Sequence, residues 1–80
     1  MTTPTDADVV ALVTKVVKTD EVAALPDLDL VEAGLLDSLA FVELVVGLEA
    51  LVGEPIPPTE VDRSELATLT KIRAFVAEYA

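Results

Sequence analysis

An apolar segment between Leu39 and Gly53 constrains the fold of this chain more than any other feature. Two glutamates interrupt it, and it is too short to cross a bilayer, which needs about 20 predominantly apolar residues. Asp37, just before the segment, is a good helix N-cap, and Gly53 can adopt the left-handed conformation that ends many helices. The sequence therefore predicts a helix over residues 38–52 in a water-soluble protein.

The predicted helix has two apolar faces when successive residues are placed about 100° apart. One face carries the side chains expected in the core: Phe41, Leu44, Val45, Leu48 and Val52. The roughly opposite face carries a second set, which we call the apolar strip: Leu39, Val42 and Val46, flanked by Glu43 and Glu49. An exposed apolar strip bounded by acids is a candidate docking surface. The alternative is that the helix is buried on both sides, or that the strip covers a loop.

Helical patterns also occur near both ends of the chain. Thr5 stands three residues before Asp8, as in a capping box, and apolar residues at helical spacing then predict a first helix over residues 6–18. Thr68 can cap a last helix whose apolar residues share one face: Leu69, Ile72, Phe75, Val76 and Tyr79.

Two connections separate these helices. Residues 19–37 form the first, which contains Pro26, Gly34 and scattered apolar residues: Leu25, Leu28, Leu30 and Val31. A connection of this length in a compact domain is usually functional or packed down by its own apolar residues. The second connection leads into a short helical turn over residues 60–66, after a group of prolines that excludes helix: Pro55, Pro57 and Pro58.

The whole pattern predicts an all-α fold, a four-helix bundle of three main helices and one short helix, with a long first loop. Eighty residues make one small domain, spanning residues 1–80. Apolar residues make up 52% of the chain, but only two Phe and one Tyr are aromatic. The core must therefore consist mainly of Val, Leu, Ile and Ala.

The charge of the chain restricts its partners. Five basic residues against fifteen acidic ones give a net charge of −10. Phosphate binding needs Lys and Arg, so nucleic acid and anionic membranes are excluded, and a basic protein surface is the natural complement. The chain has no cysteine, which excludes disulfides and thiolate metal sites. Its N-terminus lacks signal-peptide character, which predicts a cytoplasmic location.

The stretch "GLLDSL" places Ser38 at the start of the predicted second helix. A serine nucleophile needs a general base, and the chain has no histidine. The glycines that flank the serine of a nucleophile elbow are also missing. We therefore predict no catalytic residue and no enzymatic activity, although a lysine base stays open: Lys15, Lys18 or Lys71.

The acidic segment "DLDLVEAG" is a candidate metal loop. It supplies Asp27 and Asp29, but Val31 stands where a calcium loop has its third oxygen ligand. The glycine that should follow is absent as well. The sequence therefore predicts no metal site.

Two interpretations of Ser38 remain. In the first, it is an ordinary early helical residue after the Asp37 cap. In the second, another enzyme esterifies the hydroxyl with a phosphate-linked arm, because the N–H groups and partial positive charge of a helix N-terminus favour a phosphate there. The apolar strip would then lie beside the arm, where a partner could recognise both.

The segment "GLLDSLAFVELVVGLEALVG" resembles the acyl and peptidyl carrier proteins, whose attachment motif is Asp-Ser-Leu at the start of the second helix of a four-helix bundle. The resemblance covers the whole chain. It implies that a phosphopantetheinyl transferase, using coenzyme A and magnesium, attaches 4′-phosphopantetheine to Ser38, next to Asp37. The terminal thiol of the arm would hold cargo as a thioester. It also implies a partner-binding set: Leu39, Val42, Glu43, Val46 and Glu49.

Other positions resemble particular branches of this family. Ala40 stands where many fatty-acid carriers have an acid, and Phe41 where they often have a small polar residue. The segment "PPTEVDRSELATLTKI" looks most like stand-alone D-alanyl carrier proteins, through Pro57, Glu60, Val61, Asp62, Arg63, Thr68 and Lys71. We add Arg63 to the expected partner-binding residues.

Our main hypothesis is a monomeric, discrete aminoacyl carrier that an adenylating amino-acid ligase loads in trans. It would deliver its cargo to an acyltransferase or synthase, in D-alanylation or in macrolactam polyketide or nonribosomal peptide biosynthesis. One alternative is a polyketide or fatty-acyl carrier protein. Another is an unmodified helical module whose apolar strip binds a basic partner helix.

Overall fold

A computed structural model describes residues 5–57 and 61–79 of the chain. It contains three α-helices, α1 (Asp6–Val17), α2 (Ser38–Val52) and α3 (Leu69–Tyr79). Two short 3-10 helices, η1 (Asp20–Ala23) and η3 (Arg63–Leu66), lie in the connections. The described residues contain no strand, so the predicted all-α fold with three main helices is confirmed.

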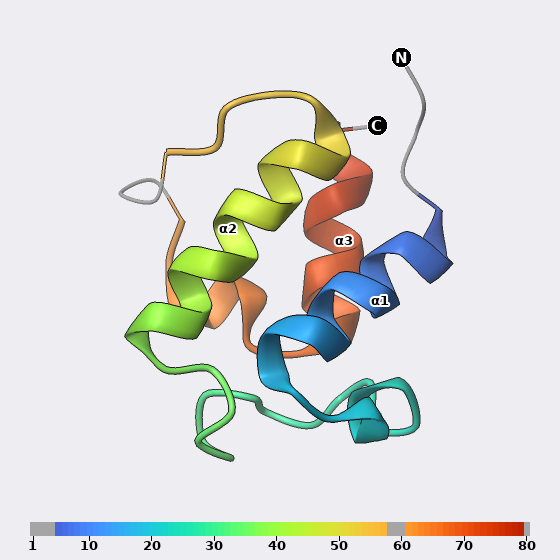
Figure 1. The fold of residues 1–80 in the computed structure, drawn as a ribbon, viewed down its shortest axis with the longest axis vertical. Coiled ribbons are helices and arrows are strands. Elements are labelled where there is room, and N and C mark those ends of the chain that lie inside the picture. The colour runs from blue at the N-terminus through green and yellow to red at the C-terminus, as the bar shows by residue number, and fades with distance from the viewer. Residues whose placement is uncertain (1–4, 58–60, 80) are drawn as a thin grey trace.

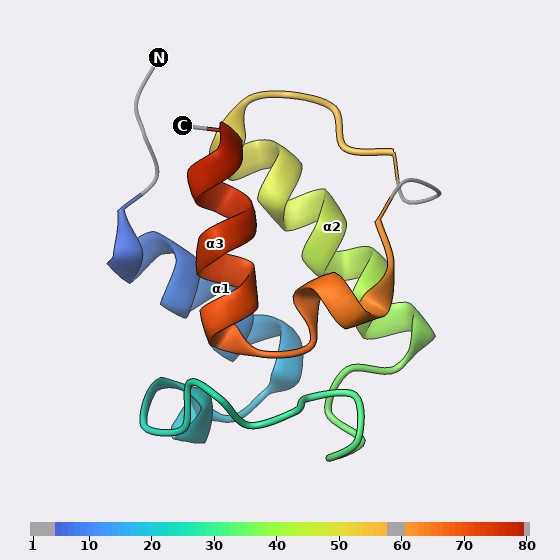
Figure 2. The same ribbon diagram turned by 180° about the vertical axis from the view of Figure 1, so that it is seen from behind.

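The three helices pack against one another in all three pairs, as the two opposite views show (Figures 1 and 2). The long connection between α1 and α2 passes across one end of the bundle, where α2 and α3 both begin. The predicted short fourth helix is the 3-10 turn η3 and not an α-helix. Glu60, where that turn was expected to start, lies outside the described residues.

The helix ends follow the capping residues in the sequence. At α1, the Asp8 N–H donates to Thr5 Oγ1 and the Thr5 N–H donates to Asp8 Oδ2, both over 3.1 Å, which completes the predicted capping box. The Lys71 N–H donates to Thr68 Oγ1 over 3.1 Å, so Thr68 caps α3 as predicted. Helix α1 ends one residue earlier than predicted, because Lys18 is left-handed, with φ of 61°.

Helix α2 has the predicted bounds. The Ala40 N–H donates to Asp37 Oδ1 over 2.8 Å, and Gly53 ends the helix with φ of 74°. The predicted core face of this helix is buried throughout: Phe41, Leu44, Val45, Leu48 and Val52. The apolar strip on the opposite face is exposed, at 69% for Leu39, 46% for Val42 and 59% for Val46. The alternative that α2 is buried on both sides is therefore wrong.

The long connection is fixed to the start of α3. Val22, Leu30 and Leu36 are fully or almost fully buried. The Leu30 N–H donates to the Ala67 carbonyl over 2.7 Å, and the Thr70 N–H donates to the Pro26 carbonyl over 3.0 Å. The expectation that apolar residues of this loop pack it down holds for Leu30 but not for Leu25, which is 48% exposed.

Helices α1 and α2 approach closely at Gly47. A Cβ atom at this position would lie 2.3 Å from Leu12 Cδ1, which is closer than such atoms are found. A mid-helix glycine costs about 1 kcal/mol in helix propensity relative to alanine. Here the missing side chain makes room for Leu12.

The two faces of α2 can be compared with the same substitution at adjacent positions. Val45 is fully buried and Val46 is 59% exposed. We expect Val45→Ala to lower the free energy of unfolding by about 2 kcal/mol through lost burial and the cavity left behind. Val46→Ala should change it by less than about 0.5 kcal/mol. Urea denaturation followed by circular dichroism measures both, and equal losses would contradict the assigned rotation of α2.

Candidate functional site

Ser38 is the first residue of α2, and its side chain is exposed. Two local features place it there. The Asp37 carboxylate caps the helix at Ala40 and so fixes where the helix begins. The buried face of α2 then fixes the rotation of the helix, which leaves the hydroxyl accessible to another protein.

Arg63, the first residue of η3, contacts Ser38 at the start of α2. Its Nη2 group donates a hydrogen bond to Ser38 Oγ, although the two residues are 25 positions apart in the sequence. The guanidinium carbon also lies 6.0 Å from the centroid of the Phe41 ring. The sequence predicted Arg63 as a partner contact, and the structure places it on the hydroxyl itself.

The other predicted site residues follow α2 away from Ser38. Leu39, Val42 and Val46 form the exposed apolar strip, Glu43 is exposed and Glu49 is half-buried. An open, mainly apolar groove of about 410 Å³ lies beside the strip, where α1 meets α2. It is lined by Leu12, Lys15 and Val16 from α1, and by Val42, Glu43, Val46 and Gly47 from α2.

Sequence reasoning missed the part of this groove that α1 contributes. Leu12 falls within the apolar pattern of the predicted first helix, for which no surface role was proposed, and Lys15 was considered only as a base. The isolated glycine at position 47 was the available signal, because a glycine inside a helical pattern often marks a close approach of backbones. Lys15 adds a cation to the lining of the groove, to which Glu43 contributes an acidic side chain.

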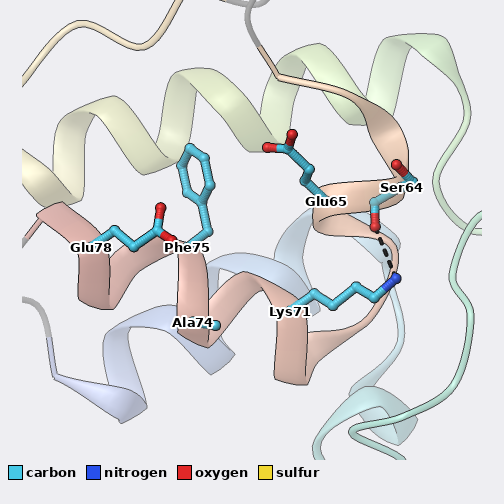
Figure 3. A pocket seen from close by; sticks show the side chains of 6 residues that line it. All are labelled: Ser64, Glu65, Lys71, Ala74, Phe75 and Glu78. Carbon is cyan, nitrogen blue, oxygen red and sulfur yellow. Dashed lines mark hydrogen bonds between the residues drawn. The ribbon is translucent and has the colours of Figure 1, made fainter.

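A second hollow, of about 480 Å³, lies over η3 and α3 (Figure 3). Figure 3 shows the six side chains that line it: Ser64, Glu65, Lys71, Ala74, Phe75 and Glu78. The Lys71 amino group donates to the Ser64 carbonyl over 3.1 Å. Lys71, one of the lysines considered as a base for Ser38, is therefore directed to a backbone oxygen of η3.

The acidic loop makes local hydrogen bonds. Asp29 Oδ1 accepts from the N–H groups of Val31 and Glu32, each over 3.0 Å, and Asp27 Oδ1 accepts from the Thr70 hydroxyl over 2.9 Å. Among residues 5–57 and 61–79, no three potential ligand side chains gather as a metal site would require.

No helix in that part of the chain is long and apolar enough to span a membrane.

The surroundings of Ser38 suit a phosphate ester. The hydroxyl is exposed, a guanidinium already bonds to its oxygen, and the N–H groups of the first turn of α2 add partial positive charge. A negatively charged group on this oxygen would thus meet a cation and a helix N-terminus.

Comparison with known proteins shows the family to which the chain belongs. Residues 7–76 match the protein family described as "Phosphopantetheine attachment site". The chain belongs to this family of carrier proteins. Its cofactor is phosphopantetheine, and proteins of this kind carry a group without catalysing its conversion.

The similar proteins include several D-alanyl carrier proteins. One from Lactococcus lactis subsp. cremoris (strain MG1363) is 43% identical over 60 residues, which cover 75% of this chain and 76% of the relative. One from Bacillus velezensis (strain DSM 23117 / BGSC 10A6 / LMG 26770 / FZB42) is 40% identical over 65 residues, covering 81% and 83%. The recognised resemblance to carriers of the D-alanyl type is confirmed.

The contribution of the Asp37 cap to the stability of this carrier protein can be measured by replacing each of two aspartates in turn. Asp37 and Asp62 both occupy N-cap positions, but only the side chain of Asp37 accepts a hydrogen bond from its helix. We expect Asp37→Ala to cost about 1 kcal/mol of stability. The matched variant Asp62→Ala should lie within about 0.5 kcal/mol of wild type. Thermal or urea unfolding of both variants tests this, and a larger loss for Asp62→Ala would reverse the assignment.

Proposed function

We propose that Ser38 is the attachment point of 4′-phosphopantetheine, and that the chain carries an aminoacyl group and presents it to partner enzymes. The arm supplies a terminal thiol, on which the cargo is held as a thioester. One observation carries the assignment of Ser38: its hydroxyl is exposed at the capped start of α2 and accepts a hydrogen bond from Arg63. The family match supports it, because the matched range includes this position.

The residues around Ser38 have separate roles in this proposal. Ser38 Oγ forms the new bond to phosphorus, while a bond within the pyrophosphate of coenzyme A breaks and the adenosine half leaves with the other phosphate. In this proposal the hydroxyl proton goes to a base on the transferase. Asp37 holds the start of α2 in place through Ala40. The exposure of Ser38 lets the transferase reach it.

We infer an amino acid as the cargo from the relatives. Proteins named D-alanyl carrier protein are 40% to 43% identical to three quarters or more of this chain. D-alanine is therefore the first cargo to test, with an adenylating ligase that activates it with ATP. A polyketide or fatty-acyl group is the competing cargo, and acyl-coenzyme A donors would supply it.

The apolar strip is the proposed docking surface for these enzymes. Leu39, Val42 and Val46 offer apolar contact area, and Glu43 beside them is exposed. An apolar centre with a polar rim is the usual anatomy of a protein interface. The net charge of −10 favours a partner with a basic surface.

Intact mass spectrometry tests the attachment point, because the chain has only two serines, Ser38 and Ser64. Wild type and Ser64→Ala should each gain one phosphopantetheine when incubated with coenzyme A, magnesium and a broad-specificity phosphopantetheinyl transferase. Ser38→Ala should gain none. Circular dichroism checks that all three proteins are helical, and a control carrier shows that the transferase is active.

The same experiment separates the competing functions. A gain of mass by Ser38→Ala would overturn the attachment point. No gain by wild type would favour the unmodified interaction module, whose binding should survive loss of the hydroxyl. Loading of the modified protein by malonyl-coenzyme A and an acyltransferase, but not by D-alanine with ATP and its ligase, would replace the aminoacyl cargo with an acyl one.

Charge reversal tests the docking surface. We expect Glu43→Lys to lower kcat/KM for aminoacyl loading about tenfold at low salt, mainly through slower association, and less at high salt. Glu78→Lys makes the same charge change on an exposed residue near the far end of α3 and should change kcat/KM less than about twofold. Loading rates of the two variants are compared from about 20 to about 500 mM salt, a range over which the screening of surface charges increases strongly. Equal effects of the two variants would argue against a local docking surface.

A further inference from the structure

We propose that Arg63 is the binding residue for the phosphodiester that links the arm to Ser38, rather than a contact for a partner enzyme. This inference rests on the proposed attachment at Ser38. It assigns to Arg63 a role within the modified carrier itself: the guanidinium neutralises the phosphodiester and holds the base of the arm against η3.

The hydrogen bond to Ser38 provides the geometry. Arg63 Nη2 donates to Ser38 Oγ, the atom that would be bonded to phosphorus. The two non-bridging oxygens are each two bonds from Oγ, through the phosphorus, so a guanidinium that reaches Oγ also reaches them after a small rotation. These oxygens share the negative charge and are better acceptors than the ester oxygen. The planar guanidinium can donate to both at once.

Two features of the structure hold Arg63 in this position, the anchored turn η3 and the ring of Phe41. Arg63 is the first residue of η3, and Leu66 at the end of that turn is completely buried, which anchors the turn in the core. The guanidinium carbon lies 6.0 Å from the centre of the Phe41 ring, and Phe41 is 8% exposed. Because Phe41 stands one turn after Ser38 on α2, the ring supports the guanidinium beside the hydroxyl.

Local charge favours a cation at this point. The phosphodiester would add a negative charge one residue from the Asp37 carboxylate, in a chain whose net charge is already −10. The Asp37 side chain is held in place because it caps Ala40. The partial charge of the helix N-terminus is about half an elementary charge, which does not balance a carboxylate and a phosphodiester together. Arg63 supplies the missing positive charge.

The binding is measurable as a coupling between modification and residue 63. Attachment of phosphopantetheine should lower the equilibrium constant for unfolding by a factor that is about three times larger in wild type than in Arg63→Gln. A difference of this size corresponds to the contribution of one exposed charge pair to stability. Urea unfolding of the apo and modified forms of both proteins gives this ratio. The difference should shrink at high salt. Because each variant is compared with its own apo form, any general loss of stability cancels.

The ³¹P spectrum reads the phosphodiester directly. Its resonance should shift between modified wild type and modified Arg63→Gln, and Arg63→Lys should restore the charge but only part of the shift. Lys18→Gln is the matched control, since Lys18 lines a hollow with Asp37 and Leu39. That variant should leave both the resonance and the stability ratio close to wild type.

Each outcome decides the proposal. Wild type that gains no phosphopantetheine would overturn both the attachment at Ser38 and the role of Arg63. Normal modification with equal stability ratios and unshifted resonances in Arg63→Gln would overturn only the role of Arg63. Equal effects of Lys18→Gln and Arg63→Gln would also overturn it, because they would show a general effect of charge and no specific contact.

Discussion

The rotation of α2 about its own axis is the constraint on which the rest of the site depends. Leu44, Val45 and Leu48 are completely buried, and any turn of the helix would expose them. At about 2 kcal/mol for each side chain removed from the core, this packing outweighs what the few contacts of the exposed face could supply. The positions of Ser38 and the apolar strip therefore follow from the opposite, buried face of the same helix.

Most of the fold could be predicted because its signals are local. The carboxylate of Asp37 and the glycine at position 53 mark the ends of α2, and both act within one helical turn. The end of α1 was misplaced by one residue because Lys18, unlike glycine, gives no sign that it adopts a left-handed conformation. The exposure of the apolar strip depended on which face the other helices cover, so the sequence left two alternatives open.

The contacts that complete the site could not be predicted from spacing. Arg63 and Ser38 are 25 positions apart, and Thr70 and Asp27 are 43 apart. Such pairs depend on how η3 and the long loop settle on the bundle, which no local pattern encodes. The residue types were still informative: Arg63 was selected as functional from its sequence context, but its contact with the hydroxyl required the arrangement of both segments.

The exposed apolar strip has a consequence for the behaviour of the protein at high concentration. Three adjacent aliphatic side chains in contact with water could pair with the same surface on a second copy, which is how many homodimers form. Two copies with a charge of −10 each repel one another as they approach. The excess of acidic residues thus opposes self-association through the apolar strip, and it leaves the strip open to a protein of opposite charge.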